Sequence, residues 1–175
     1  MTEPTTSDPT ITVRPARADD IPGLVASSTA LFAEDAGTRD PSVDANWPRE
    51  HAAVSFTAAL DDPARLVLAV EYAGAVVGHL TGSLAEPTAM RPVKAATLIS
   101  VYVRPAHRSS GAGARLVDAF VRWAGERGAE HAEVTAYAAN TDAIRFYERN
   151  GFARQSLTLR LSLGAGSGTG TDTGL

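Results

Sequence analysis

The alternation of apolar and polar positions divides the chain into a series of predicted helices and strands. Apolar residues that recur every three or four positions indicate helices, and strict alternation or short apolar runs indicate strands. Strands are predicted at 10–14, 66–72, 75–84, 95–103, 132–138 and 152–163, and helices from about 21, at 48–60, at 111–127 and at 141–149. The predicted order is therefore β-α-α-β-β-β-α-β-α-β.

Turn and capping residues support these boundaries. Asp19 or Asp20 can cap the first helix, and Gly128 ends the third. The segment 36–47, which contains glycine, proline and asparagine, is predicted to be a loop. A two-residue turn at Ala73-Gly74 joins two strands, which favours an antiparallel meander. We expect an α/β (α+β) fold, with a mixed, mostly antiparallel sheet flanked by helices.

The chain of 175 residues is long enough for one domain with a sizeable core. We expect that domain to cover residues 10–163. Residues 1–9 are polar and are expected to form a flexible N-terminus. Residues 164–175 are rich in glycine, threonine and serine, cannot bury a core, and are expected to form a disordered tail.

Composition excludes several classes of function. The chain has no cysteine, which excludes disulfides, thiolate zinc sites and a cysteine nucleophile, and no histidine pair has metal-ligand spacing. A formal net charge of −4 does not favour nucleic acid as a partner. We find neither a secretory signal nor an apolar run long enough for a membrane span, so we expect a cytoplasmic protein without a metal.

Acidic residues are concentrated between Leu31 and Asp62. This stretch holds seven acids against two arginines, a net charge of −5. One interpretation is a solvated surface of helices and loop, and the other is an entrance that attracts a cationic substrate.

The segment Arg108-Ser109-Ser110-Gly111-Ala112-Gly113 lies between a predicted strand and a predicted helix. Because a helix N-terminus presents unpaired N–H groups and partial positive charge, this loop is predicted to bind an anion such as a phosphate. A plain turn that needs two glycines is the alternative. A dinucleotide fingerprint is excluded by Leu116, and a P-loop is excluded by Ala114-Arg115 after Gly113.

Together with the strand Val101-Tyr102-Val103 and the later segment 140–152, this loop resembles the two signature regions of the GNAT superfamily of acyl-CoA-dependent N-acetyltransferases. The family's phosphate loop reads Arg/Gln-x-x-Gly-x-Gly/Ala. Its second signature is a strand, an asparagine, a helix with a tyrosine, and a closing Gly-Phe. The resemblance extends from about residue 10 to residue 163.

The resemblance implies acetyl-CoA or coenzyme A as the co-substrate, with no metal. Main-chain N–H groups from Ser109, Ser110, Gly111, Ala112, Gly113 and Ala114 would hold the pyrophosphate, and Arg108 would add charge. The backbone of Val101, Tyr102 and Val103 would pair with the pantetheine arm, and an N–H near Val101 would stabilise the oxyanion.

Asn140, Ala143 and Tyr147 share one helix face by their spacing. The resemblance implies that they contact the cofactor and that Tyr147 protonates the departing thiolate or donates a hydrogen bond to it. Taken from the residues alone, Asn140 is equally well a helix cap, and Tyr147 a half-buried aromatic residue of the core.

The proton acceptor is the point at which the chain departs from the family pattern. Thr97 stands where some members carry a glutamate on the strand before the phosphate loop, and threonine is not a base. Glu34 is the favoured side-chain candidate, Asp35, Glu86 and His79 are the others, and a chain of water molecules to bulk solvent is an equal alternative.

These observations predict an enzyme that moves an acetyl group from acetyl-CoA to a primary amine by direct attack in a ternary complex. The acceptor is expected to be a small amine or an amine-bearing peptide, with no nucleic acid or membrane partner. Many members of the family pair as dimers, so a homodimer is among the expected assemblies. The alternative is a non-catalytic acyl-CoA-binding or interaction module on the same fold.

Overall fold

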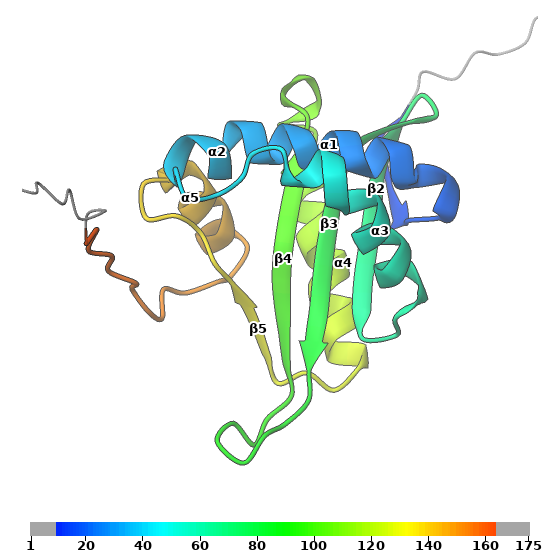
Figure 1. Ribbon diagram of the computed structural model, residues 1–175. Helices are drawn as coiled ribbons and strands as arrows, with labels where there is room; N and C mark the ends of the chain where they lie inside the picture. The colour runs from blue at the N-terminus through cyan, green and yellow to red at the C-terminus, as the bar shows by residue number, and fades with distance from the viewer. Residues whose placement is uncertain (1–9, 164–175) are drawn as a thin grey trace, which may run out of the picture.

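A five-stranded sheet with the order β1-β2-β3-β4-β5 forms the centre of the computed structural model, which describes residues 10–163 (Figure 1). The strands are β1 (Thr12–Pro15), β2 (Arg65–Tyr72), β3 (Ala75–Ala85), β4 (Ala95–Val103) and β5 (His131–Val134). The pairs β1–β2, β2–β3 and β3–β4 are antiparallel, and the pair β4–β5 is parallel. The mixed, mostly antiparallel sheet is therefore confirmed.

Helices cover both faces of this sheet (Figure 1). The helices are α1 (Ile21–Glu34), α2 (Ala36–Arg39), α3 (Trp47–Asp61), α4 (Ala112–Glu126) and α5 (Thr141–Arg149), with single 3-10 turns η1 (Ala18–Asp20) and η2 (Pro105–His107). Among residues 10–163, no helix combines the length and apolar character that a bilayer crossing requires.

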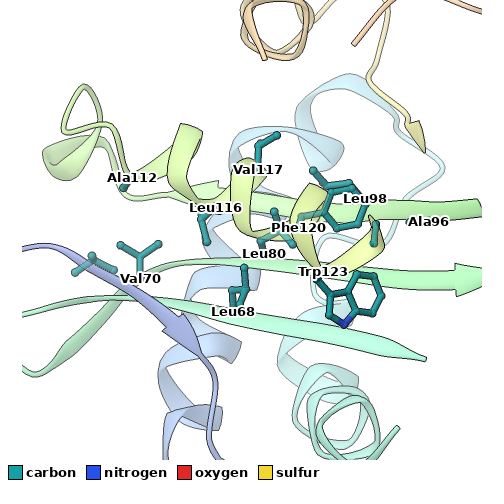
Figure 2. Close-up of a cluster of buried hydrophobic side chains, with 12 residues drawn as sticks. Leu68, Val70, Leu80, Ala96, Leu98, Ala112, Leu116, Val117, Phe120 and Trp123 are labelled. Atoms are coloured by element: carbon teal, nitrogen blue, oxygen red, sulfur yellow. The ribbon is translucent and has the colours of Figure 1, made fainter. Parts of the chain in front are cut away.

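Alternation along β2 divides the core into two clusters. Val67 and Ala69 pack with Leu24 of α1 and Phe56 of α3, whereas Leu68 and Val70 pack on the opposite face with α4. Figure 2 shows this second cluster, in which Leu116 and Phe120 of α4 lie over the strands. Successive strand residues point to opposite faces, so a strand buried on both faces reads as a continuous apolar run.

A β-bulge at Ile99 changes the direction of the side chains along β4. Thr81 of β3 is opposite Ser100, but the next residue, Gly82, is opposite Leu98, so Ile99 has no partner in the register. Before the bulge, Leu98 packs in the α4 cluster; after it, Val101 packs there. The extra residue thereby turns the even-numbered side chains toward α1 beyond Ile99.

The structure corrects two predictions of local structure and leaves two outside its range. The segment predicted as a loop contains α2, whose turn is reinforced by an ion pair between Asp35 and Arg39. The strand predicted at 152–163 is wrong: this segment has no strand assignment, because no neighbouring strand offers it hydrogen bonds. The predicted flexible N-terminus, 1–9, and the predicted tail, 164–175, lie outside the described residues.

Candidate functional site

Strands β4 and β5 part halfway along β4. Their parallel pairing runs from Ala95 to Leu98, which is opposite Val134, while β4 continues to Val103. Figure 1 shows the two strands diverging toward the end of the sheet that α1, α2 and α5 cover. Main-chain groups of Ile99–Val103 on the β5 side are thus left without a strand partner among residues 10–163. Such an edge can hydrogen-bond an extended ligand.

The predicted cofactor residues Val101, Tyr102 and Val103 lie on this open stretch of β4. Val101 and Val103 pack toward α4, and the bulge directs Tyr102 toward the end of α1. Tyr102 is buried, and burial together with the carboxylate of Glu34 raises its pKa. The sequence suggested only the backbone of this residue, because the bulge that aims its side chain has no local signature.

The predicted phosphate loop leads from β4 through η2 into α4. Ser109 and Gly111 adopt positive φ angles of 65° and 79°. The hydroxyl of Ser110 accepts a hydrogen bond from Ala112 N at 3.3 Å and donates one to the carbonyl of His107. In the first turn of α4, the N–H groups of Gly113 and Ala114 have no intrahelical acceptor. The loop therefore presents oriented main-chain donors where an anion was predicted.

The two glycines of this loop serve different purposes. Gly111 is required by its left-handed backbone, and no atom would meet its added Cβ within 4 Å. A Cβ at Gly113 would lie 3.1 Å from Cε2 of Phe146. Gly113 therefore allows the N-terminus of α4 to approach α5, which brings the two signature segments together.

Arg108 is held by three groups. Its Nε donates to the carbonyl of Val103 at 2.8 Å, its Nη2 lies 2.7 and 2.8 Å from the two carboxylate oxygens of Glu34, and its guanidinium lies 5.4 Å from the ring centre of Tyr102. Arg108 and Glu34 are both partly exposed, with side-chain exposures of 43% and 45%. The ion pair can therefore exchange partners at low cost.

Asp35 makes the corresponding connection to the second signature. Its Oδ1 accepts a hydrogen bond from Nδ2 of Asn140 at 2.8 Å. The same oxygen forms an ion pair with Nη1 of Arg39 at 2.9 Å. The Oδ1 atom of Asn140 in turn accepts from Ala143 N, so Asn140 caps α5. The cap interpretation of Asn140 is correct, and its amide is already engaged at both ends.

Tyr147 is half-buried on the face of α5 that carries Asn140 and Ala143. Its ring packs edge-on against Phe146 and Phe152, at centroid distances of 5.4 and 5.8 Å. Burial, with a smaller contribution from the charge of Asp35, raises the pKa of Tyr147 to about 12. Tyr147 is thus a neutral hydroxyl donor at any physiological pH.

The candidates for proton acceptor are dispersed. Glu34 lies beside Arg108, whereas Glu86 pairs with Lys94 at 2.8 Å near the β3–β4 loop, at the opposite end of β4 from the phosphate loop. Thr97 lies in the paired half of β4, opposite Glu133. Of these residues, only Glu34 joins the site.

His79 is enclosed in a chain of hydroxyl groups that sequence reasoning missed. Its Nδ1 lies 2.7 Å from Ser27 Oγ, its Nε2 lies 3.1 Å from Ser100 Oγ, and Ser100 Oγ lies 2.7 Å from Thr81 Oγ1. Burial lowers the pKa of His79 to about 4, so the ring is neutral at pH 7. Ser27 and Ser100 carry no signal in the sequence, because only the bulge and the packing of α1 bring them together.

Arginine side chains pair with several acids of the 31–62 stretch. Glu34, Asp35 and Asp40 pair with Arg108, Arg39 and Arg160, respectively. The Arg160 guanidinium holds the pKa of Asp40 well below its usual range. Two of these three arginines, Arg108 and Arg160, come from outside the 31–62 stretch, so other segments neutralise part of the acidic charge near the site. In the described part of the chain, no three acidic or histidine side chains gather as a metal site.

Comparisons with known proteins address the family and the fold of this chain. A family model described as the acetyltransferase (GNAT) family matches residues 30–152. A transcriptional regulator from Bacillus halodurans C-125 has a TM-score of 0.71 and 25% identity, over 87% of this chain and 99% of that chain. Aminoglycoside N-acetyltransferase AAC(6′)-Iy in complex with CoA has a TM-score of 0.71 and 13% identity, over 90% and 97%.

Glucosamine-6-phosphate N-acetyltransferase from Arabidopsis thaliana has a TM-score of 0.64 and 15% identity, over 89% of this chain and 99% of that chain. At 13% and 15% identity, these two acetyltransferase structures show that this chain has the same fold as they do. A comparison with curated protein sequences gives no match.

Proposed function

The chain belongs to the acetyltransferase (GNAT) family, and from this premise we propose that it transfers an acetyl group from acetyl-CoA to the nitrogen of a primary amine. The observation that carries the proposal is the parting of β4 and β5 after Leu98, directly beside the N-terminus of α4. An open strand edge and a set of main-chain anion donors suit the two ends of one ligand, an extended pantetheine arm and a diphosphate.

The residues present fit coenzyme A. The N–H groups of Gly113 and Ala114, the open space around Gly111 and the guanidinium of Arg108 suit a diphosphate. The open edge at Val101–Val103 suits the amide groups of pantetheine. When bound, acetyl-CoA supplies an activated thioester, and a main-chain N–H near Val101 would stabilise the negative charge that develops on its carbonyl oxygen.

Glu34 and Arg108 couple the two halves of the proposed site. A diphosphate at the loop competes with Glu34 for the guanidinium of Arg108. When Arg108 turns to the phosphates, the carboxylate of Glu34 loses its partner and becomes available to take a proton from the acceptor amine. This exchange favours binding of the coenzyme before the amine.

Tyr147 is proposed to act on the departing sulfur as a hydrogen-bond donor. A thiol has a pKa near 8.5, and burial raises the pKa of Tyr147 to about 12. Full proton transfer from the phenol to the thiolate is therefore uphill, whereas a hydrogen bond stabilises the sulfur as charge develops. The chain has no cysteine to form an acyl-enzyme, so direct attack in a ternary complex is the proposed route.

The acceptor is proposed to be a small amine or an amine-bearing peptide. The similar structures include enzymes named for aminoglycosides and for glucosamine 6-phosphate. Asp44 and Glu50 are exposed acids of the 31–62 stretch, near which a cationic acceptor would gain modest attraction.

A screen for thiol release from acetyl-CoA tests the proposal. The acceptors in the screen are amines, amino acids, aminoglycosides and peptides. Calorimetry with coenzyme A is run in parallel, and Arg108→Gln serves as a weakened-binding variant. Turnover with at least one amine supports the enzyme. Binding of coenzyme A without turnover on any acceptor favours the acyl-CoA-binding module, and absence of binding by folded protein contradicts both. The regulator from Bacillus halodurans, which shares this fold, makes the non-catalytic alternative worth this direct test.

A further inference from the structure

A chain of four hydrogen-bonded side chains runs between α1 and the sheet. It joins Ser27 of α1, His79 and Thr81 of β3, and Ser100 of β4. Ser27 and His79 are 0% exposed and Thr81 is 8% exposed, whereas Ser100 is half-buried. A buried donor without an acceptor costs free energy. The position of each hydrogen along the chain therefore follows from a count of donors and acceptors.

The hydroxyl of Ser27 determines the tautomer of His79. Among residues 10–163, Nδ1 of His79 is the only hydrogen-bond partner of Ser27 Oγ, at 2.7 Å. If Nδ1 carried the hydrogen and donated to Ser27, the hydrogen of Ser27 would be buried without an acceptor. Ser27 therefore donates to Nδ1. Because the ring is neutral at pH 7, its one N–H is at Nε2, which donates to Ser100 Oγ at 3.1 Å.

The same count applies to Thr81. In the described part of the chain, its hydroxyl has one hydrogen-bond partner, Ser100 Oγ, at 2.7 Å. If Ser100 donated to Thr81, the buried hydrogen of Thr81 would lack an acceptor, so Thr81 donates to Ser100. Both lone pairs of Ser100 are thereby occupied, one by His79 and one by Thr81. The hydroxyl of Ser100 can then only donate, and the two hydrogen bonds that it accepts strengthen it as a donor.

The remaining hydrogen of Ser100 is available on the open stretch of β4. Ser100 directly precedes Val101 and lies after the bulge, beyond the end of the pairing between β4 and β5. Its side chain is on the same face of the strand as that of Tyr102, which lies near Glu34. Ser27 and Glu34 are seven residues apart and share one face of α1. Figure 1 shows α1 crossing the strands at this end of the sheet.

We propose that the hydroxyl of Ser100 donates a hydrogen bond to the carbonyl oxygen of the bound acetyl thioester, beside the main-chain N–H near Val101. This inference rests on the proposed acetyl transfer. When the amine attacks, the C–N bond forms and the carbonyl π electrons move to the oxygen, where the hydrogen bond stabilises the charge. The electrons then return, the C–S bond breaks and the thiolate leaves. Ser100 keeps its proton throughout.

The same hydrogen-bond direction excludes a proton path from the amine through Ser100 to His79. Such a path would need a free lone pair on Ser100 Oγ, and both are occupied by His79 and Thr81. His79 and Thr81 are therefore positioning residues that act through Ser100. Ser100 is the catalytic member of the chain, because its hydroxyl touches the reacting group.

Nitrogen-15 NMR of the histidine rings tests the orientation of the hydrogen bonds without any ligand. Two-bond correlations between the carbon-bound ring protons and the ring nitrogens show which nitrogen carries the hydrogen. The chain has four histidines, so the His79 signals are assigned by elimination, with single glutamine variants at the other three. Hydrogen at Nε2 of His79 is the expected result. Hydrogen at Nδ1 overturns the assignment and the proposal with it.

The infrared carbonyl stretch of bound acetyl-CoA, labelled with ¹³C, reports the proposed hydrogen bond itself. A hydrogen bond lowers this frequency, so Ser100→Ala should raise it, and Ser100→Thr, which keeps the hydroxyl, should restore it. Ser83→Ala is the matched control and should leave the frequency unchanged. Ser83 is a half-buried serine of β3 opposite Thr97, where β4 and β5 are still paired. Equal frequencies in Ser100→Ala and the unaltered protein overturn the proposal.

Calorimetry and kinetics separate failure of this inference from failure of the proposed function. Ser100→Ala should lower kcat by about a hundredfold, the effect of removing one oxyanion donor, with little change in the affinity for acetyl-CoA. Folded, unaltered protein that does not bind acetyl-CoA contradicts the proposed function and this inference together. Binding and turnover that are the same in Ser100→Ala as in the unaltered protein overturn this inference alone.

Discussion

Glu34, the last residue of α1, forms an ion pair with Arg108 of the loop between β4 and α4, 74 positions later in the chain, with nitrogen and oxygen 2.7 Å apart. The next residue, Asp35, accepts a hydrogen bond from Asn140 at the start of α5. Two adjacent carboxylates thus tie one helix end to both signature segments. The proposed acceptor side and the proposed cofactor side are therefore linked through charge.

Glu34→Gln is expected to lower kcat by about a hundredfold, the effect of losing a general base. Affinity for coenzyme A should stay equal or increase, because Arg108 no longer has a competing carboxylate. Arg108→Gln should instead weaken coenzyme A binding. Calorimetry and steady-state kinetics measure both effects. Asp61→Asn, at an exposed acid of the same stretch that is the last residue of α3, is the control and should change neither. An unaltered kcat in Glu34→Gln would remove Glu34 from proton transfer.

Tyr147→Phe is expected to reduce kcat roughly ten- to hundredfold, the value of one hydrogen bond to a charged group. Coenzyme A affinity should change little, since the ring and its contacts with Phe146 and Phe152 are kept. Because the pKa of Tyr147 is raised to about 12, its ionisation should cause no loss of rate below about pH 11. A pH–rate profile of both proteins checks this. An alkaline fall near pH 9 that disappears in Tyr147→Phe would contradict it.

His79 is expected to make folding stability depend on pH. Its pKa is about 4 in the folded protein and about 6.5 when unfolded, so the unfolded chain binds more protons between these values. Stability therefore falls as the pH drops from about 6.5 to 4, by roughly 3 kcal/mol at about 1.4 kcal/mol per pKa unit. Urea unfolding at several pH values measures this slope. His79→Gln should flatten it, and His51→Gln, at a more exposed histidine, should not.

Substitutions at three glycines separate the effect of a close Cβ contact from the effect of a positive φ angle on folding stability. Gly113→Ala should destabilise the protein and weaken coenzyme A binding, because its Cβ meets Cε2 of Phe146 at 3.1 Å and the Phe146 ring, which packs against Tyr147, must shift. Gly111→Ala should cost about 1 kcal/mol or more through its positive φ. Gly125→Ala is the control: it lies in α4 with no atom near its added Cβ, and should stabilise by about 0.5–1 kcal/mol. Thermal and urea unfolding measure the stability changes, and calorimetry measures the affinity for coenzyme A. Equal effects at Gly113 and Gly125 would contradict the packing argument.

Asn140→Ala is expected to destabilise the protein by about 1–2 kcal/mol through loss of the α5 cap. The contact with Asp35 is lost as well, so α5 should hold less firmly to the end of α1. Asn140→Asp keeps a capping oxygen but places a second carboxylate against Asp35. It should therefore recover the cap without recovering the link. If Asn140→Asp matched the unaltered protein in both stability and coenzyme A affinity, the hydrogen bond from Asn140 to Asp35 would contribute to neither.

Local pattern was sufficient for most of the fold. The bounds of β4 at Ala95–Val103 and α5 at Thr141–Arg149 match the sequence prediction, because each is defined by its own periodicity and by a cap or turn. The turn into α4 was also predictable, since Gly111 and Gly113 stand at the junction of a strand and a helix, and anion binding there stays a prediction. Such signals are contained within a few neighbouring residues.

What the sequence by itself determined is most of the helices and strands, their order, and the strand–loop–helix junction that contains Gly111 and Gly113. Tertiary structure decided which distant groups meet: Glu34 with Arg108, Asp35 with Asn140, and His79 with Ser27 and Ser100. It also decided that Ile99 bulges and that residues 152–163 pair with no strand among residues 10–163. A helix or turn is specified by neighbours in sequence, whereas a strand and an ion pair each require a partner whose position depends on the packing of the whole domain.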